Sequence, residues 1–448
     1  MVESRHRMVD NGPSRRRLLQ GLLAAGGLAA ITGRAFAGDR SAAACRDLYI
    51  YGLPALEMAR ARARTMGPKA NQFRHVRRLA DHASRAVTTP NNDTLYSSAW
   101  LDLRAGPVEV VAPATGGRYF SLAMLDMHSN NFHITGTRVT GGRAHRVRLV
   151  PPDATPTGDA VRAPTWWVWA QGRTLVDSPA DLPAAHAVQD GLSVTPAGLD
   201  PRAAPALPAA DAPAHEQLAC IARLLEEEAP PTAAERGKVA ALRAGGMTGA
   251  AFAAPDAALI AAAAQGVAEA KRSIAAVIDS APVVDGWIYS RPSIGDFGTD
   301  HLYRAAVAVW GLAALPQVEA IYVRAAGGGG RGSPFDGAQR HRLRFAPDRL
   351  PPVGAFWSLS MYEMLPSGEL FFSDNPLRRF SIGDRTPGLV RAPDGSLEVL
   401  MSADDPGPAL RSNWLPCPRG PFTLVLRAYL PGKAFTDGSY RLPPVERW

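Results

Sequence analysis

Residues 88–103, with the sequence TTPNNDTLYSSAWLDL, mark the point at which the pattern of this chain changes. The polar residues at 88–93 form a turn-rich cluster, and the β-prone residues after them are typical of a strand. Six such segments at this spacing predict an antiparallel β sandwich or barrel. The six β-rich segments are separated by Gly, Pro and Asp and lie at 95–103, 108–111, 119–125, 131–137, 145–150 and 165–170.

The rest of the chain divides into a helical middle and a second β-rich part. Before the first strand, the spacing of apolar residues over 45–65 predicts a helix, bent at Pro54. Helices are predicted at 215–228, 232–243, 256–280 and 300–315, and further strands at 319–324, 340–345, 355–363, 369–372, 397–401 and 423–429. The predicted N-cap is Asp256 for the third helix and Thr299 or Asp300 for the fourth. No repeat at a solenoid period is present. The predicted fold is therefore mainly β with a helical middle (α+β), with two antiparallel sandwich- or barrel-like domains. The predicted boundaries are an N-terminal domain at 38–200, a linker and helical segment at 201–318, and a C-terminal domain at 319–448.

The composition excludes several classes of protein. Of the 448 residues 46% are hydrophobic and 20% are charged, which excludes a disordered, collagen-like or coiled-coil chain. The formal charge of +8 suggests an anionic partner, but no basic run is interleaved with aromatic residues, so nucleic acid is not an expected partner.

The N-terminus resembles a removable export signal. Residues 14–20, SRRRLLQ, precede an apolar stretch of about 14 residues, shorter than the roughly 20 that a membrane span needs. The small residues Ala35 and Ala37 complete the pattern of a twin-arginine signal peptide at 1–37. Its removal takes away six arginines and two acids, which is half of the +8. We therefore expect a periplasmic or secreted protein with no stable membrane span after cleavage.

Several catalytic and binding motifs are absent. The run at 327–332 fits G-x-G-x-x-G, but a turn follows it instead of the helix that a dinucleotide site needs. No G-x-S-x-G and no H-E-x-x-H occur. Cys45, Cys220 and Cys417 form no C-x-x-C pair and allow at most one disulfide. No metal site is predicted, and any cofactor is unknown.

Long and specific strings resemble two known domains. The runs at 90–100, 115–122 and 130–138 resemble domain of unknown function 1254, and those at 356–359, 375–376, 380–386 and 412–416 resemble domain of unknown function 1214. The resemblance extends from about Tyr49 to the terminus. It implies a bacterial, usually exported protein with two β-rich domains around a helical middle, and it implies no particular activity.

The segment 126–133, DMHSNNFH, contains the strongest candidate for chemistry. If it is a strand, alternation places Asp126, His128 and Asn130 on one face. Imidazole and carboxylate groups can move protons near neutral pH, so His128 is the predicted proton-transfer group and Asp126 its orienting partner. The alternatives are a solvent-facing strand surface and a metal site. Asp296, Asp300 and His301 are a second candidate for an acid/base group, ranked below this segment, and helix capping is an alternative role for Asp300.

Loop residues are the predicted binding groups, because rigid β scaffolds usually carry function on loops. Arg385 is suited to hold a carboxylate or phosphate, and the alternatives are an internal pair with Asp374 or Asp384 and hydrogen bonds to the backbone. For residues 91–93 the alternative is turn structure, and for Trp414 it is the core of a sandwich. The predicted substrate-binding residues are Asn91, Asn92, Asp93, Asn130, Asn131, Arg385 and Trp414.

Two functions fit these residues. The first is an exported hydrolase or lyase that acts on a small or oligomeric polar substrate in a cleft between the domains. The second is a non-catalytic periplasmic ligand-binding or envelope assembly protein. A homo-oligomer is compatible with both, since twin-arginine export carries folded proteins.

Overall fold

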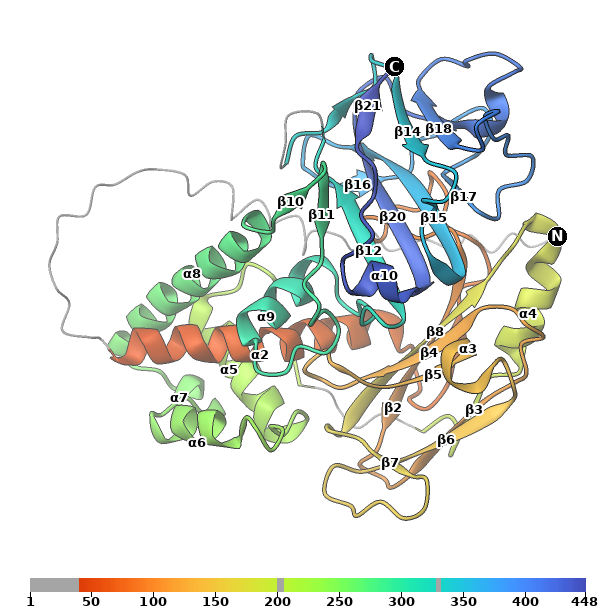
Figure 1. Ribbon diagram of the computed structural model, residues 1–448. Helices are drawn as coiled ribbons and strands as arrows, with labels where there is room; N and C mark the ends of the chain where they lie inside the picture. Colours follow the sequence, from red (N-terminus) through yellow and green to blue (C-terminus); the bar gives the residue numbers. More distant parts are fainter. Residues whose placement is uncertain (1–39, 200–204, 328–331) are drawn as a thin grey trace, which may run out of the picture.

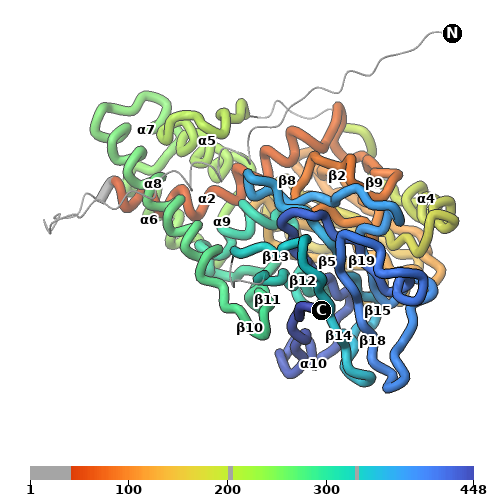
Figure 2. The backbone as a smooth tube through the Cα atoms, turned by 90° about the horizontal axis from the view of Figure 1, so that it is seen from above, coloured from red at the N-terminus to blue at the C-terminus, as the bar shows by residue number. Residues whose placement is uncertain are grey.

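The computed structural model describes residues 40–199, 205–327 and 332–448. The predicted signal peptide at 1–37 lies outside these residues. A block of helices lies beside two β units, one from each end of the chain (Figures 1 and 2). Helix and strand each make up 27% of the chain, and the described residues contain no closed barrel. The predicted α+β class, with mainly sheet domains, is confirmed.

Helix α2 (Arg40–Thr65) is the centre of the helical block and contains Pro54. Two predicted caps are confirmed: Asp256 accepts a hydrogen bond from Leu259 N at 2.7 Å, and Asp300 accepts one from Tyr303 N at 3.1 Å. Around α2 lie α5 (Ala214–Glu227), α6 (Arg236–Ala244), α7 (Gly249–Ala253), α8 (Ala257–Asp279) and α9 (His301–Trp310).

The N-terminal β unit consists of two sheets. The larger has the order β1 (Arg74–His75), β2 (Thr94–Asp102), β8 (Trp167–Leu175), β4 (Phe120–Leu125) and β5 (Asn131–Gly136). The smaller has the order β7 (Val161–Arg162), β6 (His145–Val150), β3 (Val108–Ala112) and β9 (Ser193–Thr195). Short helices α3 (Thr137–Thr140), η1 (Pro179–Asp181) and α4 (Leu182–Asp190) connect the strands. Alternate residues such as Val108, Val110, Leu122 and Met124 form the core between the two sheets.

The C-terminal β unit also consists of two sheets. The larger has the order β10 (Val283–Val284), β11 (Trp287–Tyr289), β12 (Ala320–Ala325), β20 (Pro421–Pro431), β15 (Val353–Met364) and β16 (Leu370–Phe371), with β13 (Phe335–Asp336) on β20 and β17 (Ser381–Gly383) on β15. The smaller has the order β19 (Trp414–Pro416), β18 (Leu397–Ser402), β14 (His341–Phe345) and β21 (Val445–Arg447). Helices η2 (Arg411–Asn413) and α10 (Lys433–Thr436) complete the unit.

The two β units have the same topology. The order β1-β2-β8-β4-β5 in the N-terminal unit corresponds to β11-β12-β20-β15-β17 in the C-terminal unit, and all of these neighbours are antiparallel. The smaller sheets correspond as β7-β6-β3-β9 and β19-β18-β14-β21, and each has one parallel pair at the same place. The chain therefore contains two copies of one sandwich.

Short sequence matches support this correspondence. Residues 90–96 (PNNDTLY) and 316–322 (PQVEAIY) share the pattern P-x-x-[D/E]-x-[L/I]-Y at the start of corresponding strands. The strand pairs also align equivalent residues into rows across the larger sheets. These rows are Tyr96, Arg173, Ser121 and Gly136 in one unit, and Tyr322, Arg427, Ser358 and Gly383 in the other.

The glycine that ends each row is required by close packing. A Cβ atom at Gly136 would lie 2.2 Å from the carbonyl oxygen of Phe120, and one at Gly383 would lie 2.1 Å from that of Trp357. Both neighbours are backbone atoms that cannot rotate away. The next residues serve the same purpose in each copy, because Thr137 Oγ1 accepts a hydrogen bond from Phe120 N and Asp384 Oδ1 accepts one from Trp357 N.

Candidate functional site

The two sandwiches meet through crossed ion pairs. Asp93 precedes β2, and its carboxylate lies 3.4 Å from the Arg385 guanidinium of the C-terminal unit. Glu319 precedes β12, and its carboxylate lies 2.7 Å from Arg138 of the N-terminal unit. Each unit therefore gives one acid and one arginine to the other. We call this interface between the larger sheets and the loops at 89–93 and 313–319 the seam.

The central arginine of each row also crosses the seam. Arg427 donates from Nη2 to the carbonyl oxygen of Thr89 at 3.0 Å, and Arg173 donates from Nη2 to that of Ala313 at 3.0 Å. Both acceptors lie in the loops that lead to Asp93 and Glu319. Each sandwich therefore uses its central arginine to bind a backbone carbonyl oxygen of the other.

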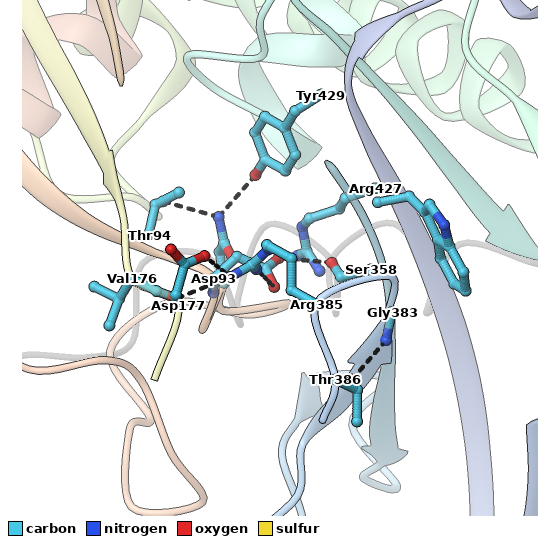
Figure 3. Close-up of polar contacts among 12 residues, drawn as sticks. Asp93, Thr94, Val176, Asp177, Ser358, Gly383, Arg385, Thr386, Arg427 and Tyr429 are labelled. Atoms are coloured by element: carbon cyan, nitrogen blue, oxygen red, sulfur yellow. Dashed lines mark hydrogen bonds and ion pairs between the residues drawn. The ribbon is translucent and has the colours of Figure 1, made fainter. Parts of the chain in front are cut away.

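Asp93 and Arg385 make several contacts in the seam (Figure 3). Ser358 donates to Asp93 Oδ2 at 2.6 Å, while Arg385 also reaches the carbonyl oxygen of Val176 at 2.9 Å and the Asp177 carboxylate at 3.2 Å. Asn91 donates to Tyr429 Oη at 2.9 Å from the same loop. Phe356 lies under the Arg385 guanidinium at 4.3 Å.

The structure thus brings three of the predicted binding residues together. Asn91, Asp93 and Arg385 lie in the seam. Arg385 pairs with Asp93 and Asp177, not with Asp374 or Asp384, and it also makes the backbone hydrogen bond of the other alternative, to Val176. Asn91 Oδ1 accepts from Asp93 N at 2.7 Å, which is the turn contact of the alternative for this loop. Asn92, beside them, is half-buried, and its Oδ1 has no hydrogen-bond partner among the described residues. Whether these groups bind a ligand stays a prediction.

Tyr51 lies at the centre of a second group of polar side chains, where the helical block meets the N-terminal sandwich. The rings of His128 and His301 lie 5.4 and 5.2 Å from the Tyr51 ring. The Arg304 guanidinium carbon lies 5.3 Å from the centre of the same ring, and Tyr51 Oη donates to Glu235 at 3.4 Å. We call these five residues the Tyr51 cluster.

Glu235 contacts three other members of the cluster, Tyr51, His301 and Arg304. Its carboxylate accepts hydrogen bonds from Thr232 Oγ1 at 2.8 Å and Arg304 Nη1 at 2.9 Å, and it contacts His301 Nε2 at 3.2 Å. Burial alone would raise the pKa of this carboxyl, but the hydrogen bond from His301 and the charge of Arg304 outweigh burial and hold the pKa well below its usual value. Glu235 is therefore ionised and fully engaged, so it is not free to act as a base.

His128 is fully buried and presents an unpartnered nitrogen. Its Nε2 lies 3.2 Å from the carbonyl oxygen of Pro230, and because a carbonyl can only accept, Nε2 carries the hydrogen. Burial, together with the charge of Arg304, lowers the pKa of His128, so the imidazole is neutral near pH 7. Nδ1 then carries a lone pair, and it has no hydrogen-bond partner among the described residues.

Arg304 offers donors beside this base. It is fully buried, and only its Nη1 is used by Glu235. The structure describes no hydrogen-bond partner for its Nε and Nη2. Native proteins seldom leave buried polar groups unpaired, and such groups often mark an unfilled binding position. A basic nitrogen and two unused donors therefore lie against one phenol ring.

Residues 126–130 are not a strand, so the condition for a shared face of Asp126, His128 and Asn130 is not met. These residues form the tight turn between β4 and β5, with Ser129 at a φ of 66°. Asp126 Oδ1 accepts hydrogen bonds from the backbone N of His128 and of Asn130, both at 2.9 Å, so the three residues do not share a strand face. Asp126 therefore orients the backbone of the turn and makes no hydrogen bond to the imidazole, and burial raises its pKa.

The remaining predicted residues lie outside the Tyr51 cluster, and Asn131 contacts the seam loop at 313–319 through Ala314. Asn130 donates to Asp126 at 3.1 Å, and Asn131 donates to the carbonyl oxygens of Gly295 and Ala314, both at 2.9 Å. Trp414 is buried in the C-terminal sandwich and donates to the carbonyl oxygen of Ser402 at 2.9 Å. Asn130 and Trp414 stabilise local structure, and Asn131 joins the start of β5 to Gly295 and to the loop at 313–319.

The other predicted features can be checked in the same residues. The three cysteines are buried and form no disulfide. Within 40–199, 205–327 and 332–448, no group of three His, Cys, Asp or Glu side chains is placed to hold a metal ion. No helix in this part of the chain is both long and apolar enough to cross a bilayer.

The sequence interpretation missed three members of the Tyr51 cluster: Tyr51, Glu235 and Arg304. Tyr51 and Arg304 lie within predicted helices, where their spacing suits the core face. Their segments are far apart, because Glu235 lies 184 residues from Tyr51. The available signal was a charged residue on the apolar face of a helix, since a buried Arg is rare unless it is paired.

Comparisons with known proteins agree with the two-sandwich architecture. Residues 70–196 match the model for a protein of unknown function, DUF1254, and residues 319–433 match that for DUF1214. The first segment coincides with the N-terminal sandwich, and the second lies within the C-terminal one. The fold and the matches together therefore define a class of proteins with two β domains. The chain belongs to the family that combines an N-terminal DUF1254 domain with a C-terminal DUF1214 domain.

Two solved structures are similar to the chain. The VPA0106 protein from Vibrio parahaemolyticus is 21% identical, covers 91% of this chain and 100% of its own, and has a TM-score of 0.69. An uncharacterised protein from Burkholderia cenocepacia is 15% identical, covers 97% of this chain and 94% of its own, and has a TM-score of 0.47. The first similarity shows the shared fold alone. No curated protein matches the chain.

Proposed function

We propose that the protein is an exported hydrolase or lyase whose proton-transfer group is His128. The observation that carries this proposal is the buried Nδ1 of His128, which has no hydrogen-bond partner among the described residues, with the unused donors of Arg304 against the same Tyr51 ring. A general base needs a lone pair at the working pH, and the lowered pKa of His128 supplies one. The Tyr51 cluster, and not a cleft between the sandwiches, is the proposed catalytic centre.

Arg304 defines the class of substrate. Its unused Nε and Nη2 hydrogens suit an oxygen that carries or develops negative charge, such as that of a carboxylate, ester or ketone. Glu235 fixes the guanidinium through Nη1, so the donors are held in place before substrate binds. The proposed substrate is therefore small and polar, with a carbonyl or carboxylate oxygen next to the atom that loses its proton.

The outer side of the cluster gives a route for substrate. The His301 side chain is 14% exposed, and the loop at 230–234 between α5 and α6 has no regular structure. This loop supplies the Pro230 carbonyl that covers His128. A movement of this loop would uncover the imidazole without disturbing the core of either sandwich.

The test uses His128→Gln, which keeps a donor for Pro230 but has no base. His341→Gln is the matched control, because His341 is also buried and its Nε2 lies 3.1 Å from the carbonyl oxygen of Asp336. The assays are hydrolysis of 4-nitrophenyl acetate and exchange of the pyruvate methyl protons in D₂O. We expect His128→Gln to lower the active reaction by about 100-fold or more while His341→Gln leaves it unchanged. Equal activity of the two variants would exclude His128 as the base.

Non-catalytic binding is the second candidate, and one observation favours it. Asp126 makes no hydrogen bond to the His128 ring, so the imidazole lacks the orienting carboxylate of many acid–base sites. Titration of the wild-type protein with pyruvate, followed by the NMR signals of the His128 ring, separates the two functions. A shift of these signals without turnover would support binding alone.

Export through the twin-arginine route is part of the same proposal, and it rests on residues 14–37 of the sequence. Fractionation of the producing cells, followed by N-terminal sequencing of the mature protein, tests it. A chain that begins at or close to Gly38 in the periplasm or the medium is the expected result.

A further inference from the structure

The two copies of the sandwich allow one buried arginine to be compared with its counterpart. Arg427 and Arg173 lie at the centre of corresponding rows, and each uses Nη2 on a carbonyl oxygen across the seam. The Nη1 group of Arg427 donates to Ser360 Oγ at 2.9 Å. The Nη1 group of Arg173 has no hydrogen-bond partner in the described part of the chain.

The sequence explains this difference. Ser360 lies two residues after Ser358 on β15, and the corresponding residue, two after Ser121 on β4, is Ala123. The N-terminal copy therefore lacks the hydroxyl that fills this position in the C-terminal copy. Arg173 is only 5% exposed, so water outside the protein does not replace the missing acceptor.

The charge around the two arginines also differs. Burial alone would lower the pKa of Arg427, but Tyr362, Tyr429 and the carboxylate of Asp93 raise it. The counterpart of Asp93 is Glu319, which is already engaged by Arg138 at 2.7 Å and by Tyr119 Oη at 2.9 Å. The phenol groups around Arg173, together with its burial, dominate the environment of that guanidinium.

Tyrosine hydroxyls supply further donors near Arg173. Tyr429 Oη accepts from Asn91 Nδ2 at 2.9 Å, so its own hydrogen is free to be donated. Tyr96 lies under the Arg173 guanidinium at 5.6 Å, and it and its counterpart Tyr322 keep part of their surface accessible. Burial raises the pKa of Tyr322 and Tyr429, so both phenols are neutral donors near pH 7.

We propose that the N-terminal half of the seam binds a small carboxylate, with one oxygen on Arg173 Nη1 and the other on a tyrosine hydroxyl. The ligand would occupy the position that Ser360 Oγ fills in the C-terminal half. This site is separate from the Tyr51 cluster and does not depend on the proposed catalysis.

The test supplies the missing hydroxyl with Ala123→Ser. The unfolding temperature of the wild-type protein is measured with increasing sodium acetate, and with sodium sulfate at equal ionic strength. We expect the unfolding temperature to rise with acetate concentration and to reach a plateau. We expect Ala123→Ser to weaken the affinity for acetate at least 10-fold, because the introduced hydroxyl then accepts from Arg173. Unchanged binding by Ala123→Ser overturns the site, and tighter binding of sulfate than of acetate overturns the carboxylate assignment.

Ser360→Ala is the matched control in the other copy. It removes the partner of Arg427 Nη1 and leaves Arg173 unchanged, so the affinity for acetate at the first site is expected to stay within 2-fold of the wild-type value. If Ser360→Ala weakens acetate binding as much as Ala123→Ser does, the effect is a general loss of seam packing and the proposal fails. Retention of the wild-type circular dichroism spectrum by Ala123→Ser confirms that the variant is folded.

Discussion

The carbonyl oxygens of Thr89 and Ala313 accept equivalent hydrogen bonds in the two halves of the protein, one residue before Pro90 and three residues before Pro316. Thr89 and Ala313 are non-glycine residues with positive φ, 51° and 66°, and each accepts a hydrogen bond from the central arginine of the opposite sandwich. Left-handed backbone is unfavourable for such residues, so the surrounding structure must hold both loops. The same constraint appears twice because the same interface is built twice.

Loss of the Asp93 carboxylate should weaken the seam. Asp93 is 3% exposed, and Asp93→Ala leaves the Arg385 guanidinium and the Ser358 hydroxyl without their buried partner. We expect a loss of about 2 to 3 kcal/mol in the free energy of unfolding, measured with urea. Asp177→Ala is the control, because Asp177 contacts the same arginine but is 59% exposed, and its effect should stay below about 1 kcal/mol. Equal effects of the two variants would contradict this account.

The glycine at the end of the N-terminal row should not tolerate a Cβ atom. Gly136→Ala places that atom 2.2 Å from the Phe120 carbonyl oxygen, so we expect a loss of about 2 kcal/mol or more. Gly106→Ala is the control, since Gly106 has almost the same φ, 125° against 123°, but open space around its Cβ. A similar loss in both variants would mean that backbone strain, and not the close approach, requires glycine.

The buried His128 should make stability depend on pH. Its pKa is lowered in the folded protein, so the unfolded chain binds a proton below about pH 6.5 that the folded protein does not bind. Stability is therefore expected to fall as the pH decreases from 7 to 5, by at most about 2 kcal/mol from this one residue. His128→Gln should lose less over this interval, as measured by urea unfolding at each pH. His145→Gln, at a half-buried histidine outside the cluster, should keep the wild-type difference.

Substitution of the arginines in the leader should block export. Replacement of Arg15, Arg16 and Arg17 by Lys keeps the charge but removes the twin-arginine pattern. We expect the precursor to accumulate in the cytoplasm, as detected by immunoblotting of cell fractions. Export at the wild-type level would show that export of this protein does not depend on the twin-arginine pattern.

The local sequence pattern was sufficient to predict most of the helices and strands. The helix predicted at 256–280 is α8 (Ala257–Asp279), and its predicted cap Asp256 makes the expected hydrogen bond. The strand predicted at 355–363 lies within β15 (Val353–Met364). These elements could be predicted because helix caps and apolar periodicity act over a few residues.

The candidate site could be predicted only in part. The Asx-rich loop at 90–93 and Arg385 were recognised as polar loop residues, but the Asp93–Arg385 contact joins positions 292 residues apart. Asp126 was misassigned, because an Asp followed by Ser and Asn within four residues is equally a turn signal. The pattern P-x-x-[D/E]-x-[L/I]-Y is present twice in the sequence, but it has only four common positions in seven residues. It indicates two equivalent sandwiches only when the strand orders are also compared.

The reciprocal contacts of the seam have the form of an isologous dimer interface, in which each protomer offers the other the same surface. Here a single chain supplies both protomers, so the pairing is intramolecular and does not depend on protein concentration. One copy can then have alanine at position 123 while the other has serine at position 360. With both copies in one chain, the two halves of the seam need not be identical, as they must be in a dimer of identical protomers.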